Sequence, residues 1–249
     1  MLRDTPDRQE IIDPHGLLEA VMSTWVEVGL QVPDGELHWM VRSEIPSGVG
    51  LKSSSAVAAA AVLALADATG TELETAQVVE VAVRAQFAAG CTVTGSVDDT
   101  WAALTLGWKV VNPSVPVAEG VALEGMWPNP EDWAVFIVER GERTAEIDPQ
   151  AFGMAQPNFQ KALMAIQQGA LDNAMTENGR GVASATRDTA GRKICNDLLV
   201  WGARCAAISG SGPSIAFLIP TVNEAAIDRI LETIEQRGLT VFETAIRTE

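Results

Sequence analysis

The sequence predicts an α+β protein of two domains, and three observations carry this prediction. Helical periodicity dominates the first half, where two long helices follow a Pro/Gly-rich turn. The second half has the order strand, helices, strand, strand, helix, strand, which is typical of a ferredoxin-like split βαβ sandwich. Between them, residues 112–130 are rich in Pro and Gly without periodicity, so we expect domains over 1–125 and 126–249.

The N-terminal half is expected to be mainly helical. Apolar residues recur at helical spacing over 14–29, and a serine cluster opens a second helix over 54–69. A Thr-Glu-Leu-Glu segment favours the start of a third helix over 72–88. Short strands are expected over 37–41, directly before the Pro/Gly-rich turn, and over 109–111.

The C-terminal half opens with a continuous apolar run at 133–138, which predicts a buried strand. The other expected elements are helices over 158–169, 171–185, 190–201 and 222–237, and strands over 206–208, 215–219 and 240–245. Together they make up the expected C-terminal domain.

Composition and charge limit the function classes. With 249 residues, 47% of them apolar, the chain can bury a substantial core. The net charge of −16 excludes nucleic acid and anionic membrane as main partners, because both require a basic surface. The longest apolar run, 56–66, is too short to span a bilayer, and the N-terminus lacks a signal-peptide core, so we expect a soluble cytoplasmic protein.

Cysteine and histidine usage argues against two enzyme classes. Cys91, Cys195 and Cys205 are odd in number and widely spaced, which fits neither a disulfide framework nor a zinc ribbon. A serine hydrolase is disfavoured because only His15 and His38 could act as its base. A metal hydrolase is disfavoured because no His/Cys/Asp cluster has ligand spacing, so any metal is expected to be Mg²⁺ brought by ATP.

The most informative segment is residues 46–55, Pro-Ser-Gly-Val-Gly-Leu-Lys-Ser-Ser-Ser, which we name the phosphate loop. Gly48 and Gly50 permit positive φ and close backbone approach, and the serines open a helix whose first amides carry partial positive charge. Such a segment suits a phosphate group. It is not a Walker A loop, because Leu51 separates Gly50 from Lys52. Alone, such a pattern favours an ordinary loop followed by a serine N-cap.

Two further segments bear on function. Residues 90–100 contain Thr-Val-Thr-Gly at 92–95 followed by Asp98 and Asp99, and residues 209–214 read Ser-Gly-Ser-Gly-Pro-Ser. Taken singly, the two aspartates fit a helix first turn stabilised by about 0.5 kcal/mol per acid, and the Gly-Ser-Gly turn fits a simple hairpin. The order and spacing of the three segments favour a shared function.

Together the three segments resemble those of the galactokinase, homoserine, mevalonate and phosphomevalonate (GHMP) kinases, most closely the archaeal-type shikimate kinases. The resemblance covers about residues 36–220 and implies a two-domain fold, with an N-terminal βαβ-type domain lacking its first strands and a ferredoxin-like C-terminal domain. It implies ATP-dependent phosphorylation of shikimate to shikimate 3-phosphate in chorismate and aromatic amino-acid biosynthesis. The alternatives are a homoserine or mevalonate type of kinase, or a non-catalytic nucleotide-binding member.

The resemblance also assigns roles to residues. The nucleotide-binding residues it implies are Pro46, Ser47, Gly48, Val49, Gly50, Leu51, Lys52, Ser53, Ser54 and Ser55, and the substrate-binding residues are Thr94, Asp98, Asp99, Gly210, Ser211 and Gly212. Asp98 would be the catalytic carboxylate that accepts the proton of the acceptor hydroxyl. Lys52, the second implied catalytic residue, would pair with a phosphate or a substrate carboxylate. Ser54 would help to hold Mg²⁺, and Asp99 would orient substrate or metal.

Two departures from the family keep the non-catalytic alternative open. Relatives begin with an Asn/Ala/Gly-rich strand pair, and nothing before Leu37 resembles it, so we expect a shortened fold in which residues 1–35 supply no ladder partner. The exposed sheet edge would favour self-association, for example as a homodimer. Relatives also carry a glutamate, a candidate Mg²⁺ ligand, where this chain has the segment that begins at Gln86. The nearest glutamate, Glu80, lies about two turns back, which is too far.

Overall fold

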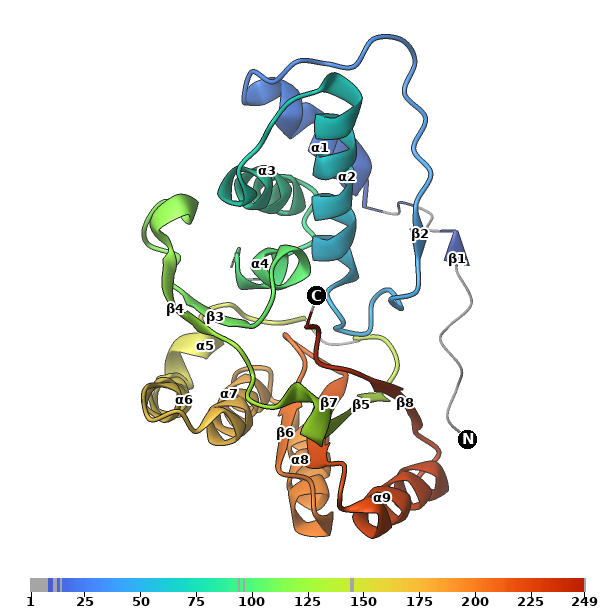
Figure 1. Cartoon of the computed structure of the whole chain (residues 1–249), viewed down its shortest axis with the longest axis vertical. Coiled ribbons are helices and arrows are strands. Elements are labelled where there is room, and N and C mark those ends of the chain that lie inside the picture. Colours follow the sequence, from blue (N-terminus) through green and yellow to red (C-terminus); the bar gives the residue numbers. More distant parts are fainter. Residues whose placement is uncertain are drawn as a thin grey trace. The chain divides into compact units, whose positions relative to one another are not determined.

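The structure is a computed structural model that describes residues 9–10, 13, 15–93, 95, 97–143 and 146–248. The chain packs as two compact units (Figure 1). One consists of Pro46–Leu51 together with Trp127–Thr248, and the other is formed by the described residues of 7–45 with 52–126. The expected boundary between residues 125 and 126 stays a proposal. The first half of the phosphate loop packs with the C-terminal half of the chain.

The N-terminal unit is mainly helical. Its elements are β1 (Gln9–Glu10), α1 (Leu17–Glu27), β2 (Arg42–Ser43), α2 (Ser53–Thr69), α3 (Thr75–Ala88), α4 (Asp98–Leu104), β3 (Trp108–Val111), the 3₁₀ turn η1 (Val117–Glu119) and β4 (Val121–Gly125). The helices α1, α2 and α3 pack around a core that includes Trp25, Val62 and Val78, all of them buried. The Asp13 carboxylate starts α1 by accepting hydrogen bonds from the amides of the first two helical residues at 2.7 and 2.8 Å. The helices α1, α2 and α3 lie where apolar periodicity predicted them, so these three predictions are confirmed.

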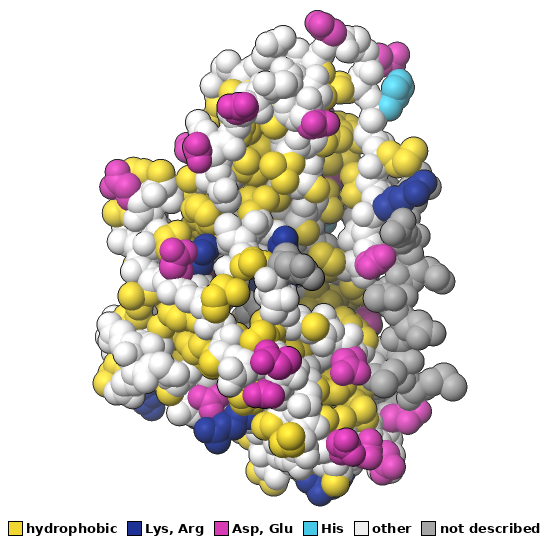
Figure 2. Space-filling model, viewed as in Figure 1, with side chains coloured by type: hydrophobic (Ala, Val, Ile, Leu, Met, Phe, Trp, Pro, Cys, Tyr) yellow, Lys and Arg dark blue, Asp and Glu magenta, His cyan; other side chains and the backbone are white. Residues whose placement is uncertain are grey.

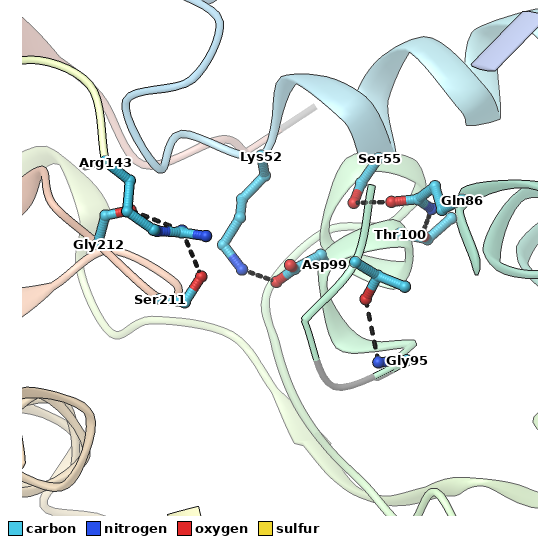
Figure 3. Close-up of polar contacts among 10 residues, drawn as sticks. Lys52, Ser55, Gln86, Gly95, Asp99, Thr100, Arg143, Ser211 and Gly212 are labelled. Carbon is cyan, nitrogen blue, oxygen red and sulfur yellow. Dashed lines mark hydrogen bonds and ion pairs between the residues drawn. The ribbon is translucent and has the colours of Figure 1, made fainter. Parts of the chain in front are cut away.

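A buried polar network joins α2, α3 and α4 (Figure 3). The Ser55 hydroxyl donates to the side-chain oxygen of Gln86 at 2.8 Å. The Gln86 amide nitrogen donates to the Ala82 carbonyl at 3.2 Å and to the Thr100 hydroxyl at 3.1 Å. Ser55, Gln86 and Thr100 are at most 4% exposed, so the network lies wholly in the interior. The network links Ser55, which follows Ser54, to Thr100, which follows Asp99.

The C-terminal unit is an antiparallel sheet with helices against it. Its elements are the 3₁₀ turn η2 (Pro130–Asp132), β5 (Trp133–Glu139), α5 (Ala151–Met154), α6 (Gln156–Gln167), α7 (Leu171–Ala185), α8 (Thr189–Trp201), β6 (Cys205–Ile208), β7 (Ile215–Pro220), α9 (Glu224–Gln236) and β8 (Thr240–Thr244). The strand order is β6-β7-β5-β8, with every neighbour antiparallel. This arrangement confirms the predicted α+β class and the positions of its strands.

Alternation along β5 separates the two faces of this sheet. Phe136 stacks on Phe217 of β7 with ring centroids 5.1 Å apart, and both rings pack against α7, α8 and α9. The next residue toward the N-terminus, Val135, points to the other face and packs with Leu218 and Trp133. Successive side chains of a strand point to opposite faces of the sheet, and here both faces are covered by apolar residues.

Three expectations for the N-terminal half were wrong. Residues 37–41 form no strand: Trp39 and Val41 pack against the helical core, and Met40 between them is 76% exposed. The strand lies instead at β2 and pairs with β1 at residues 9–10, so residues 1–35 do supply a short ladder partner. β4 lies within the stretch 112–130, where its residues alternate between half-buried and exposed, and it pairs with β3 across a bulge.

The surface carries the excess of negative charge that the composition requires. Figure 2 shows carboxylates scattered over the visible face, with fewer cations among them. Within the part of the chain that the structure describes, the helices are too short or too polar to cross a membrane. Cytoplasmic localisation stays a prediction.

We expect Gln86→Leu to lower the free energy of unfolding by about 2–4 kcal/mol, because it leaves the Ser55 and Thr100 hydroxyls buried without their partner. Gln167→Leu, the same change at an exposed helical position of α6, is the control and should change stability by less than about 0.5 kcal/mol. Urea denaturation of the two variants measures both effects. Equal stabilities would mean that the network contributes nothing.

Candidate active site

The phosphate loop packs directly on the Gly-Ser-Gly turn, although about 160 residues of sequence separate them. The Val49 carbonyl accepts a hydrogen bond from the Ser214 amide at 3.1 Å, and the Val49 side chain is buried. The turn is closed by two further bonds, from the Ser209 amide to the Ser214 carbonyl and from the Gly212 amide to the Ser209 carbonyl, each 2.8 Å. The first and third sequence motifs therefore form one backbone structure.

The contact between the two motifs requires glycine. Gly50 has φ of +84°, and a Cβ built there would collide with the Gly212 carbonyl oxygen and lie 2.5 Å from its carbon. Gly212 itself has φ of +82°, and Gly48 has +76°. These backbone angles, together with the close approach, explain why the two motifs are glycine-rich.

Arg143 holds the same two segments together and was not found by sequence analysis. Its amide donates to the Gly48 carbonyl at 3.3 Å, and its Nη2 donates to the Ser211 hydroxyl at 2.6 Å and the Gly212 carbonyl at 2.8 Å (Figure 3). Nothing in the local sequence marks this arginine, since it lies in a short loop after β5. Only the fold brings it to both motifs.

A second arginine, Arg140, also contacts the Gly-Ser-Gly turn. Arg140 donates to the Pro213 carbonyl at 3.0 Å and makes a two-point ion pair with Asp188 at 2.5 and 3.0 Å. Burial would raise the pKa of Asp188, but the hydrogen bonds from Arg140 and from the Gly191 amide outweigh it and hold that pKa below its usual value. The same carboxylate accepts from the Gly191 amide at 2.8 Å and so caps α8.

The start of α2 contains an unusual lysine. Lys52 precedes the first helical residue with φ of +66°, a left-handed conformation that costs a residue with a side chain about 1 kcal/mol. Its Nζ forms an ion pair with Asp99 at the start of α4 (Figure 3). Strain at one residue together with a specific partner is a combination common at functional sites.

The two neighbouring aspartates differ in environment. Asp98 is exposed, whereas Asp99 is half-buried and paired with Lys52. Burial, followed by the adjacent Asp98 charge, raises the pKa of Asp99 above its usual value, and the ion pair with Lys52 opposes that rise. Asp98 forms no ion pair with any described residue, so its carboxylate stays available to solvent and ligands.

The serines of the phosphate loop are not equivalent. Ser53 and Ser54 are half-buried at the first turn of α2, where backbone amides have no intrahelical partner. The Ser55 side chain is buried and committed to Gln86, so it can contribute only through its backbone. Of the substrate-binding residues expected in the middle motif, Thr94 lies outside the described residues. The neighbouring Thr92 hydroxyl accepts from the Gly95 amide at 3.0 Å.

The oxygen donors present suit a hard cation that arrives with a nucleotide. Hydroxyl and carboxylate oxygens of Ser54 and the aspartates are ligands that Mg²⁺ prefers, and Mg²⁺ is commonly held by few protein groups together with phosphates. Over the described residues, no cluster of three or more His, Cys, Asp or Glu side chains has the arrangement of a metal site. Glu80 is on the surface of α3 and pairs with Arg84 at 3.9 Å, so it does not replace the glutamate that relatives carry.

Comparison with known proteins gives consistent results. Residues 17–107 match the model of the GHMP kinases N terminal domain. A shikimate kinase from Methanothrix thermoacetophila is 32% identical over 211 residues, which is 82% of this chain and 68% of that protein. A shikimate kinase from Methanosarcina acetivorans is 31% identical over 207 residues, 82% of this chain and 67% of the relative.

Solved structures agree on the fold. The homoserine kinase of Cytophaga hutchinsonii superposes with a TM-score of 0.60 at 17% identity, over 93% of this chain and 76% of that one. An identity this low establishes the fold and not the substrate. The extent and identity of the archaeal matches establish more: this chain belongs to the archaeal-type shikimate kinases, within the GHMP kinase superfamily.

Proposed function

We propose that this chain transfers the γ-phosphoryl group of ATP to a ring hydroxyl of shikimate, giving shikimate 3-phosphate. The observation that carries the proposal is the contact of Gly50 with Gly212, which joins the two glycine motifs into one backbone surface. Phosphoryl transfer depends mainly on positioning and charge neutralisation, and such a surface offers amides at close range without side chains in the way. Membership of the shikimate kinase family supports the choice of acceptor.

Each motif has a distinct part in the proposed reaction. The amides of residues 48–54 bind the phosphates of ATP, aided by the free N–H groups at the start of α2. Asp98, exposed and without an ion-pair partner among the described residues, accepts the proton of the acceptor hydroxyl. Lys52 neutralises phosphate charge, and in the absence of ligand that positive charge is balanced by Asp99.

Magnesium would be held by the Ser54 hydroxyl together with oxygens of the nucleotide. When bound, Mg²⁺ neutralises charge on the transferred phosphoryl group. Asp99 directly follows Asp98 in the sequence, and its ion pair with Lys52 opposes the rise in its pKa that burial causes. We assign it the orientation of substrate or metal.

A coupled assay over several acceptors tests the substrate assignment. We expect turnover of shikimate with ATP and little or none of homoserine, mevalonate or galactose. Turnover of homoserine or mevalonate in place of shikimate would overturn the acceptor and leave the kinase class intact. Binding of ATP with no turnover of any acceptor would favour the non-catalytic alternative.

Asp98→Asn should lower kcat by roughly 10²-fold or more, because an amide cannot accept the proton. The matched control is Asp99→Asn, one residue away in the same helix turn, which should have a smaller effect on kcat. Calorimetry with ADP should give nearly the same affinity for the Asp98 variant as for the natural chain. An unchanged kcat would mean that Asp98 and Asp99 only stabilise the start of α4.

Gly50→Ala should weaken ADP binding at least about tenfold, because the new methyl group must displace the Gly212 carbonyl from the phosphate loop. Gly70→Ala is the control, since Gly70 also has positive φ, +63°, but faces open space. That variant should lose about 1 kcal/mol of stability and keep its ADP affinity. Equal ADP affinities for the two variants would show that the contact with Gly212 is not needed.

A further inference from the structure

The guanidinium of Arg143 carries a positive charge that no described carboxylate neutralises. Among the described residues, no carboxylate lies within ion-pair distance of its guanidinium, whereas Arg140, Arg180 and Arg204 each have one. Its fixed partners are neutral, namely the Ser211 hydroxyl and the Gly212 carbonyl. Neutral acceptors satisfy N–H groups but leave the positive charge uncompensated.

The guanidinium of Arg143 is held close to the Gly-Ser-Gly turn. Arg143 as a whole is exposed, but its bond to the Gly212 carbonyl is partly buried, and desolvation lowers the pKa of its guanidinium below the ordinary value. The chain has 33 acidic residues, so its composition offers many carboxylates that could have paired with this arginine. A guanidinium that is fixed on neutral groups and has no carboxylate partner among the described residues can pair with an external anion.

The guanidinium is oriented as a binding group requires. Its side-chain hydrogen bonds to Ser211 and Gly212 both use Nη2, which fixes one side of the planar group on the turn. Figure 3 shows another terminal nitrogen, free of dashed lines, that points away from Gly212. A guanidinium held on one side by backbone and open on the other can bind an oxyanion with little loss of side-chain entropy.

We propose that Arg143 binds an oxyanion of a substrate, either the carboxylate of the acceptor or a phosphate of the nucleotide. This inference rests on the proposed kinase function, since its place on the phosphate loop and the Gly-Ser-Gly turn gives it access to those groups. It adds to that function a residue outside all three sequence motifs. A cation at this point also offsets the repulsion that a chain of net charge −16 exerts on anionic substrates.

The test uses Arg143→Met, which keeps an unbranched stem and removes the charge, and Arg143→Lys, which keeps the charge. Arg84→Met, the same change at an exposed helical position, is the control. KM is measured for shikimate and for ATP separately, together with ADP binding by calorimetry. Thermal unfolding of each variant establishes that it is folded.

We expect one ligand to lose affinity by about 10- to 100-fold in Arg143→Met, with partial recovery in Arg143→Lys and no change in Arg84→Met. A rise in KM for shikimate alone identifies the acceptor carboxylate, whereas a rise in KM for ATP with weaker ADP binding identifies a phosphate. Both results support the proposal.

Two results would overturn it. One is a folded Arg143→Met variant whose two KM values and ADP affinity stay within about twofold of the natural chain. The other is an equal loss for both ligands that Arg143→Lys does not relieve, which would mean that the arginine only holds the turn. If the natural chain fails to phosphorylate shikimate, the proposed function fails by itself. The ADP arm and the acceptor that does turn over then decide the role of Arg143.

Discussion

The approach of Gly50 to the Gly212 carbonyl is the constraint on which the rest of the site depends. It is a contact of backbone with backbone, so it cannot adjust by changing a rotamer. The Val49–Ser214 hydrogen bond and the Arg143 side chain act on either side of it, and Arg140 fixes the turn through Pro213. Each of these interactions is possible only because a glycine leaves room for the two loops to touch.

The charges of Lys52 and Arg143, which belong to different units of the chain, are compensated in different ways. Lys52 has a left-handed backbone and Asp99 as its partner, whereas the side-chain partners of Arg143 among the described residues are neutral. A cation with a carboxylate partner can exchange it for a phosphate when ligand binds, at the cost of releasing the aspartate. A cation without one has nothing to release. The two residues therefore suit different tasks, one adjustable and one preorganised.

Sequence patterns predicted most of the fold because most of its elements have a regular period. The helix at Leu171–Ala185 and the strands around Phe136 and Phe217 follow from apolar spacing alone. β4 was not predicted because its short alternating pattern lies in a stretch rich in Pro and Gly, and β2 was not predicted because it is only two residues long. The glycine motifs were visible in the sequence, but Arg143 was not, since a loop arginine acquires its role only from tertiary contacts.

The buried network explains why this chain has glutamine where relatives were expected to have an acid. Gln86 both accepts, from Ser55, and donates, to Ala82 and Thr100. A carboxylate could accept from the two hydroxyls but could not donate to the Ala82 carbonyl, and it would bring a charge to a position that is 4% exposed. The amide is therefore the group that fits three helices packed this closely. It follows that α2 and α4, which carry Ser54 and Asp98, are joined in the interior by neutral hydrogen bonds, in addition to the Lys52–Asp99 ion pair at their starts.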